Sequence, residues 1–238
     1  MMLKEKVAII TGSGKGIGKS IALAFAKEGC NIVLVARTEN DIKKVGKECE
    51  TFGIHSLPIK ADIRSVKDVK RLVEITIKKF GKIDFLVNNA GVWYFKPLHK
   101  STIEEINEQI DTNLKGLVYC TRFVLPYMIK QRNGIIVNIS SGAGHYAFTD
   151  LAVYCATKFG VNAITKSVAK EVERFEIKVY SVCPGFVATP GQEKFMGKAK
   201  FTVAKHVMIK PEKIAKKVLE LCTEKIKSSS GSCTDVYF

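Results

Sequence analysis

Long hydrophobic runs are missing from this sequence of 238 residues. No apolar stretch reaches the roughly 18 uninterrupted residues that a membrane-spanning helix requires. The first residues, M-M-L-K-E-K, lead directly into a predicted strand and leave no room for the apolar core of a signal peptide. We therefore expect neither a membrane span nor a membrane partner.

Closely spaced cysteine pairs are also missing, although the chain contains seven cysteines. Disulfide scaffolds and common zinc motifs depend on such spacing, and the sequence contains no C-x-x-C pair. Several cysteines fall inside apolar runs, which is typical of buried thiols in a reducing compartment. The sequence therefore predicts a cytoplasmic protein and no metal site.

Acidic residues are scarce relative to basic ones, with 23 against 38 and a net charge of +15. The lysines are spread along predicted helices and mixed with Glu, and the densest basic stretch, at 197–210, contains no base-reading motif. This pattern favours a solvated lysine-rich surface over a nucleic-acid site. A positive field also helps to attract an anionic cofactor or substrate.

Apolar runs alternate with segments of helical periodicity along the whole chain. Runs such as I-V-L-V lack polar alternation, as expected for strands covered on both faces of a parallel sheet. We therefore predict one α/β domain over residues 1–238, a doubly wound, mostly parallel seven-stranded sheet with helices on both faces. A small substrate-side segment is expected at about 190–210. The predicted strands are 6–10, 31–36, 55–61, 83–88, 134–140, 178–183 and 233–238. The predicted helices are 17–27, 39–52, 65–80, 102–132 with a break near Asn113, 151–175 and 211–225.

The stretch T-G-S-G-K-G-I-G-K-S, at 11–20, comes close to two phosphate-binding patterns. As a P-loop it has Ser13 in place of the first glycine, and shifting to Gly12 makes the spacing one residue too long. The strand ends N-N-A-G, S-S-G and C-P-G also lack the acidic residue that holds magnesium. As a dinucleotide turn it has glycines for the tight turn, for close approach of the pyrophosphate and for helix packing. The dinucleotide interpretation is therefore favoured.

Further motifs follow the glycine-rich turn along the sequence. Their combination and order identify a protein family far more specifically than any single motif does. With them the chain resembles the short-chain dehydrogenase/reductase family from about residue 4 to about residue 225. The family implies a Rossmann fold that binds a nicotinamide cofactor. The motifs are T-G-S-G-K-G-I-G (11–18), A-D-I (61–63), N-N-A-G (88–91), Asn113 in D-T-N-L-K-G, I-V-N-I-S-S ending at Ser141, Y-C-A-T-K (154–158) and P-G-F-V-A-T (184–189).

The predicted catalytic residues are Asn113, Ser141, Tyr154 and Lys158. Hydride transfer to a carbonyl requires a proton donor at the oxygen, and Lys158 lies one helical turn after Tyr154, where its ammonium would lower the phenol pKa. Ser141 is expected to hydrogen-bond the substrate oxygen. Ser140 is its rival, and strand alternation allows only one of the two to face the site. The resemblance implies that Asn113 holds a water in a proton relay.

The end of the second predicted strand decides the expected cofactor. NAD-binding relatives carry an acid there, whereas this chain has V-L-V-A-R-T. Arg37 suits a 2′-phosphate, and Lys15 adds a second positive charge, so NADP(H) is predicted. The predicted cofactor-binding residues are Gly12, Ser13, Gly14, Lys15, Gly16, Ile17, Gly18, Arg37, Thr38, Asp62, Ile63, Asn89, Ala90, Gly91, Tyr154, Lys158, Pro184, Gly185, Val187 and Thr189.

Aromatic residues dominate the segments that should line the substrate side, which favours an apolar carbonyl or alcohol. His145 is either a polar contact there or simply a loop residue. The chain ends in S-S-S-G-S-C-T-D-V-Y-F instead of the family's V-D-G-G tail, which moves the expected homodimer or homotetramer contacts to the helices around 113–132 and 151–175. The predicted substrate-side residues are Trp93, Ala143, His145, Tyr146 and Phe186.

The resulting prediction is an NADP(H)-dependent oxidoreductase that interconverts a ketone or aldehyde with an alcohol, with Tyr154 as general acid/base. It could be a carbonyl reductase or alcohol dehydrogenase, or alternatively a 3-oxoacyl-thioester reductase of the acyl-carrier-protein type. A nucleotide-sensing regulator without turnover is a third alternative, disfavoured because all four catalytic residues are present.

Overall fold

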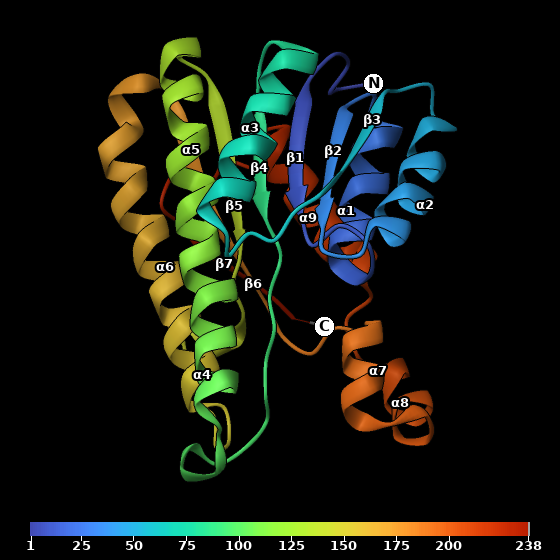
Figure 1. Ribbon diagram of the computed structural model, residues 1–238, viewed down its shortest axis with the longest axis vertical. Coiled ribbons are helices and arrows are strands. Elements are labelled where there is room, and N and C mark those ends of the chain that lie inside the picture. Colours follow the sequence, from blue (N-terminus) through green and yellow to red (C-terminus); the bar gives the residue numbers. More distant parts are fainter. Residues whose placement is uncertain (238) are drawn as a thin grey trace.

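A single parallel sheet forms the centre of the computed structural model, which describes residues 1–237. Its seven strands run in the order β3-β2-β1-β4-β5-β6-β7, so the chain winds outward from β1 in one direction and then from β4 in the other (Figure 1). Ligands of such sheets bind beyond the carboxyl ends of the strands, at the point where the winding reverses. The strands are β1 (Val7–Thr11), β2 (Asn31–Ala36), β3 (Ser56–Lys60), β4 (Phe85–Asn88), β5 (Gly134–Ile139), β6 (Ile177–Pro184) and β7 (Cys233–Val236).

Helices cover both faces of the sheet. Helices α1, α2 and α9 pack together on one face, and α3, α5 and α6 lie on the other, where α4 continues into α5 (Figure 1). Two short helices, α7 and α8, lie beyond the carboxyl end of the sheet. The helices are α1 (Gly16–Lys27), α2 (Glu39–Glu50), α3 (Val66–Phe80), α4 (Ile103–Ile110), α5 (Gly116–Gln131), α6 (Ala152–Val172), α7 (Pro190–Met196), α8 (Lys198–Ala204) and α9 (Pro211–Cys222).

The core consists of two apolar layers, one on each face of the sheet. All five residues of β1 are buried, so its alternate side chains contribute to both layers. Phe25 of α1 packs edge-on against Phe85 of β4 in the first layer, and Met128 of α5 is fully buried in the second. The absence of polar alternation in the strand sequences follows from this double covering.

Local capping fixes where several helices begin and end. The Ser65 hydroxyl accepts a hydrogen bond from the Asp68 amide at the start of α3, and Gly81 ends that helix in the left-handed conformation. Thr102 and Glu105 form a reciprocal capping box at the start of α4. These caps provide partners for backbone amides that the start of a helix leaves unpaired.

The predicted elements agree with the structure except in one segment, at one predicted break and at a few ends. The helix predicted at 102–132 changes register near Asn113 but does not break there, because a π-helical turn over Asp111–Lys115 joins α4 to α5 without interruption. The segment 190–210, for which no helix was predicted, contains α7 and α8. The last strand ends at Val236, and the predicted extension to residue 238 reaches beyond the described residues.

Hydropathy along the helices agrees with the absence of long apolar runs in the sequence. Within residues 1–237, no helix combines the length and the apolar character needed to cross a bilayer.

Candidate functional site

The glycine-rich turn joins β1 to α1 at the carboxyl edge of the sheet. Gly12 has a φ of +65°, and a Cβ at Gly18 would collide with the carbonyl oxygen of Gly12 and lie 2.5 Å from Asn89 Nδ2. Helix α1 therefore starts in direct contact with the turn. The first turn of α1 has no acidic residue and, within the described chain, no side-chain cap. The backbone N–H groups at the N-terminus of α1 are therefore available to bind an anion.

Hydrogen bonds tie this turn to the neighbouring strands. The Thr11 hydroxyl accepts from the amides of Asn89 and Ala90 at 3.0 and 3.1 Å, and Asn89 Nδ2 donates to the carbonyl oxygens of Thr11 and Gly12 at 2.9 and 3.2 Å. The Ser13 amide donates to the Val35 carbonyl, and the Ser13 hydroxyl accepts from the Val35 amide at 2.9 Å. Ser13 and the Asn89 side chain therefore hold the turn in shape with their own polar groups.

The two serines after β5 face opposite ways, as strand alternation predicts. Ser140 is buried and its hydroxyl donates to the Lys158 carbonyl oxygen at 3.2 Å. The Ser141 hydroxyl lies at the start of the next turn, where it accepts from the Ala143 amide at 3.2 Å, and its proximity to Tyr154 acts to lower the pKa of that phenol. Ser141 is therefore the serine that lies beside Tyr154.

Tyr154 and Lys158 come together on one side of α6. The Lys158 ammonium nitrogen lies 5.6 Å from the centroid of the Tyr154 ring and donates to the Ile139 carbonyl oxygen at 2.8 Å. Lys158 is 4 % exposed, and the backbone of Gly91 lies next to its ammonium group. The helical spacing thus brings phenol, ammonium and the end of β5 to one place.

The pKa of Tyr154 differs from what the sequence predicted. Burial raises it to about 12, and the hydrogen bond with Ser141 only partly offsets this. Burial also lowers the pKa of Lys158 to about 8, with the nearby Cys183 acting in the opposite direction. The pKa of Tyr154 is therefore shifted upward by burial, in the direction opposite to the predicted lowering by Lys158.

Asn113 lies in the π-helical turn between α4 and α5 and is almost completely buried. Its side-chain amide donates to the Val92 carbonyl at 2.8 Å and to the Thr157 hydroxyl at 3.2 Å, and its oxygen accepts from the Val92 amide at 2.8 Å. π turns are frequent at functional sites because they displace one residue from the helical register. Here the displaced residue connects the loop after β4 to α6.

Arg37, at the end of β2, belongs to a charged group that sequence analysis did not predict. Its guanidinium donates to Glu108 Oε1 of α4 at 3.2 Å, and the same carboxylate accepts the Tyr94 hydroxyl at 2.5 Å and lies 3.6 Å from Arg64. The hydrogen bond from Tyr94 and the two guanidinium groups outweigh burial and lower the pKa of Glu108. Lys15 is exposed at the start of α1, and Thr38 is the N-cap residue of α2.

Asp62 and Ile63 lie after β3, as predicted. Burial opposes ionisation of Asp62, but hydrogen bonds from Arg64 prevail and hold the pKa of this carboxyl below its usual range. Two Arg64 nitrogens donate to the carboxylate, the closest at 2.6 Å. Ile63 is buried, and its side chain packs against Gly116 at the start of α5.

The segment after β6 lies close to the glycine-rich turn. The Thr189 hydroxyl accepts from the Gln192 amide as the cap of α7, and its methyl group is the nearest neighbour of Gly16. Val187 is buried, pairs with Ile209 in a parallel bridge and follows Pro184 and Gly185 at the end of β6. The predicted cofactor residues of both segments are therefore adjacent in space.

The predicted substrate-side residues do not all face the same way. Trp93 packs against Gly191 of α7, whereas Tyr146 and Phe186 are 61 % and 67 % exposed. Ala143 is buried beneath the Ser141 turn. His145 turns away from this surface, because its Nε2 lies 3.4 Å from Asp235 Oδ1 of β7.

Thr11, Arg64 and Glu108 are part of the site but were not predicted. Thr11 stood inside the quoted motif, and its position at the end of a buried strand was the available signal. Arg64 and Glu108 lie 44 residues apart in the chain. No local pattern connects them with each other or with Arg37.

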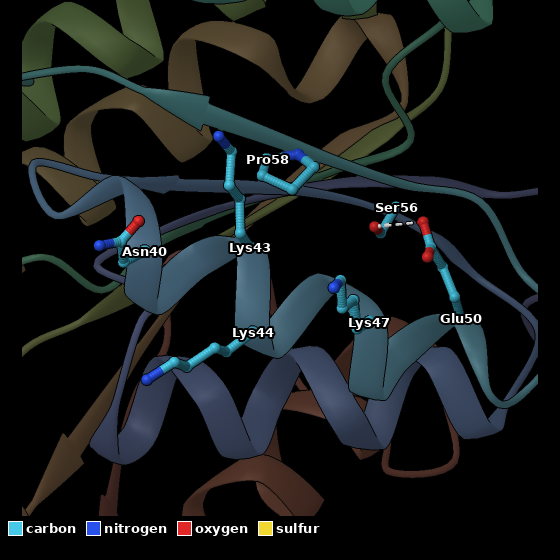
Figure 2. A pocket seen from close by; sticks show the side chains of 7 residues that line it. All are labelled: Asn40, Lys43, Lys44, Lys47, Glu50, Ser56 and Pro58. Carbon is cyan, nitrogen blue, oxygen red and sulfur yellow. Dashed lines mark hydrogen bonds between the residues drawn. The ribbon is translucent and has the colours of Figure 1, made fainter.

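An open hollow of about 400 Å³ lies elsewhere, between α2 and the edge strand β3. In Figure 2, Lys43 extends toward Pro58, and the Ser56 hydroxyl donates to Glu50 at 2.8 Å at the opposite end. Lysines of α2 line this hollow and face solvent. Tyr154 and Lys158 lie far from it, on α6 near the other edge of the sheet. We therefore place the candidate site at the carboxyl ends of the central strands instead.

Comparisons with known proteins point to one family. The family model for short chain dehydrogenase matches residues 6–199. The chain is 37 % identical over 235 residues to a 3-oxoacyl-[acyl-carrier-protein] reductase of Thermotoga maritima, covering 97 % of this chain and 96 % of the relative. It is 34 % identical to the enzyme of the same name from Staphylococcus epidermidis, covering 98 % and 97 % of the two chains.

Solved structures show the same similarity. Levodione reductase superimposes with a TM-score of 0.93 at 25 % identity, over 99 % of this chain and 97 % of the other. A 3-ketoacyl-(acyl-carrier-protein) reductase from Brucella melitensis, complexed with NADH, superimposes with a TM-score of 0.90 at 31 % identity, over 98 % and 97 %.

Proposed function

The chain belongs to the short-chain dehydrogenase family of oxidoreductases, and from this premise we propose that it transfers hydride between NADP(H) and an apolar ketone or aldehyde. The observation that carries the proposal is the position of Tyr154, which lies near the Ser141 hydroxyl and has the Lys158 ammonium nitrogen 5.6 Å from its ring centroid. A proton donor and a hydrogen-bonding hydroxyl side by side are what carbonyl reduction requires.

The glycine-rich turn fits a dinucleotide. The uncapped start of α1 provides outward amides for a pyrophosphate, and the contact between Gly12 and Gly18 leaves no room for side chains beside it. When bound, the nicotinamide supplies or accepts the hydride. The turns containing Gly91 and Pro184 would hold its ribose and carboxamide, with Asp62 and Ile63 at the adenine.

Arg37 and Lys15 support a preference for NADP(H). Both are exposed near the turn, and the strand end carries no acid that would bind a ribose hydroxyl. A guanidinium can form paired hydrogen bonds with a phosphate. Arg64 is a third cation close to Arg37, because both guanidinium groups contact Glu108.

Proton transfer is assigned to Tyr154. With a pKa of about 12 the phenol is protonated at neutral pH, so it can donate to the oxygen that gains negative charge as hydride arrives. Ser141 would hydrogen-bond the same oxygen, and the Lys158 ammonium would stabilise the resulting phenolate. Asn113 positions Thr157 and the loop after β4 around these groups.

Exposed aromatic side chains support an apolar substrate. The rings of Phe95 and Phe195 lie 5.5 Å apart and connect the loop after β4 with α7. Tyr146, Phe148 and Phe186 are also exposed around the carboxyl edge. We propose that this surface, together with the segment at 190–210, receives the body of the substrate.

A 3-oxoacyl thioester is the second candidate substrate. Two relatives named as 3-oxoacyl-[acyl-carrier-protein] reductases align with nearly the whole chain. The helices α7 and α8 carry Lys194, Lys198 and Lys200, which would attract an acidic carrier. Turnover of acyl-thioester ketones that exceeds turnover of simple apolar ketones would favour this candidate.

The first test is a fluorescence titration with NADPH and, separately, NADH, followed by turnover of both substrate classes. Tight NADPH binding with much weaker NADH binding is the expected result. Failure to bind either nucleotide would overturn the oxidoreductase mechanism. Binding without turnover of either substrate class would point to a nucleotide-sensing regulator instead.

We further propose a homo-oligomer located in the cytoplasm. Val118 of α5 and Phe159 of α6 are exposed apolar residues on the helices expected to associate, and all seven cysteines within residues 1–237 are free thiols. Light scattering of the wild type and of Phe159→Glu tests the association. A monomeric wild type would contradict it.

A further inference from the structure

Three side chains with metal-binding atoms converge at the edge of the sheet formed by β6 and β7. His145 lies in the turn after Ser141, Cys183 near the end of β6 and Asp235 in β7, where it pairs in register with Cys183. One ligand atom from each residue lies within 4.8 Å of the other two. His145 Nε2 lies 3.4 Å from Asp235 Oδ1.

One buried polar atom of this cluster, within the described part of the chain, lacks a hydrogen-bond partner. His145 Nε2 is buried and, within the described part of the chain, has no hydrogen-bond partner. The Cys183 thiol is fully buried, and its contacts with the Ser181 hydroxyl and Asn162 Oδ1 are both 3.7 Å long. A buried nitrogen without a partner is costly and calls for an explanation.

A bound metal ion would provide that explanation. We propose that His145 Nε2, Cys183 Sγ and an Asp235 carboxylate oxygen form a binding site for Zn²⁺. Imidazole, thiolate and carboxylate are all zinc ligands, whereas Mg²⁺ and Ca²⁺ prefer oxygen alone. Three protein ligands leave the fourth tetrahedral position for water.

The dimensions of the cluster suit this ion. Zinc bonds of about 2.0–2.3 Å place tetrahedral ligand atoms about 3.3–3.8 Å apart. The His145–Asp235 separation of 3.4 Å already lies in that range. The remaining separations, none above 4.8 Å, need to close by at most about 1 Å. The side chain of Asp235 is 38 % exposed and provides a way in for the ion.

The site would connect two segments of the proposed catalytic centre. His145 follows Ser141 by four residues, and Cys183 directly precedes Pro184 at the end of β6. A metal held between them fixes the Ser141 turn relative to the turn after β6. Spacing in the sequence predicted no metal site, because the ligands come from three segments far apart in the chain.

Cobalt and zinc binding test this proposal without reference to turnover. The reduced, chelator-treated full-length protein is titrated with Co²⁺ and then with Zn²⁺. We expect one equivalent of Co²⁺ to produce tetrahedral visible bands and a thiolate-to-cobalt charge-transfer band, and Zn²⁺ to displace both. Zn²⁺ should also raise the thermal midpoint of the wild type.

Matched variants identify the ligands. Asp235→Asn and His145→Ala should each weaken Co²⁺ binding at least tenfold, and Cys183→Ala should abolish the charge-transfer band. Cys233→Ala, a thiol on the same strand as Asp235, and His99→Ala, an exposed histidine, should bind like the wild type. Circular dichroism without metal shows whether each variant is folded, and if Cys183→Ala is not, His145→Ala and Asp235→Asn decide.

The proposal would be overturned by Co²⁺ binding without a thiolate band, or by a band that persists in both His145→Ala and Asp235→Asn. No binding at all would also overturn it and would leave a His145–Asp235 ion pair as the explanation of the cluster. Because the readout is metal binding, the outcome is independent of whether the proposed hydride transfer is observed.

Discussion

The guanidinium of Arg37 donates a hydrogen bond of 3.2 Å to the Glu108 carboxylate, although 71 residues separate them in the chain. Glu108 also accepts the Tyr94 hydroxyl, so it stays in place when Arg37 moves. Under the proposed function, a 2′-phosphate and Glu108 would compete for the same guanidinium. The strength of NADPH binding would then depend on the outcome of that competition.

Replacing Arg37 with alanine should weaken NADPH binding by about 10- to 150-fold, the value of a lost charge-assisted hydrogen bond of about 1.5–3 kcal/mol. NADH binding should change little, since it has no 2′-phosphate. Fluorescence titration with both nucleotides measures the difference. Equal losses for NADPH and NADH would contradict the assignment of Arg37 to the phosphate.

Replacing Glu108 with glutamine should have the opposite effect. The neutral amide keeps the shape of the side chain but releases Arg37, so NADPH binding should tighten several-fold. Glu104→Gln on the same helix, which lies outside the Arg37 contacts, is the matched control. Weaker NADPH binding by Glu108→Gln would mean that the carboxylate orients Arg37 instead of competing for it.

Replacing Tyr154 with phenylalanine removes the proposed proton donor and leaves the ring in place. We expect kcat to fall by about 10²- to 10⁴-fold, the usual contribution of general acid catalysis. NADPH binding should stay within a few-fold of the wild type. Retention of most activity would move the proton donor elsewhere.

The pH dependence of carbonyl reduction should report Lys158. Because burial lowers the pKa of Lys158 to about 8, its ammonium is charged below that pH and is lost above it, while Tyr154 stays protonated up to about pH 12. We therefore expect kcat with saturating NADPH to be level below pH 8 and to fall above it. In Lys158→Arg the guanidinium stays charged, so its residual activity should show no such inflection.

Replacing Gly18 with alanine should destabilise the protein. The new methyl group would collide with the Gly12 carbonyl oxygen and lie 2.5 Å from Asn89 Nδ2, which forces the turn and α1 apart. Overpacking of this kind costs about 1–3 kcal/mol, or a lowering of Tm by about 2–12 °C in a domain of this size. Gly142→Ala, whose methyl group would meet its nearest neighbour at 3.8 Å, should leave the Tm nearly unchanged.

Features encoded by local sequence were predicted well. The continuous apolar runs located the strands, because a sheet covered on both faces has no polar side. The four-residue spacing of Tyr154 and Lys158 placed both on one side of α6, and alternation separated Ser140 from Ser141. In each case a few neighbouring residues determine the geometry.

Features that depend on distant segments were not predictable in this way. The Arg37–Glu108 pair and the orientation of His145 toward Asp235 arise from contacts between distant segments, and the raised pKa of Tyr154 arises from tertiary burial. The short helices α7 and α8 were missed for a different reason. They leave Val203 and other apolar residues exposed, so the periodic apolar side that predicts a helix is incomplete.

The parallel bridge between Val187 and Ile209 has an evolutionary consequence. The chain leaves the body of the domain at one of these residues and re-enters at the other, with backbone hydrogen bonds from Ala188 to Ile209 and from Ile209 to Phe186 closing the gap. Insertions, deletions or exchanges between them leave the strand register unchanged, and long surface excursions cost little free energy. Residues 190–208 therefore form a segment that can change in length without disturbing the strands, and under the proposed function it is the part of the chain where substrate preference would change.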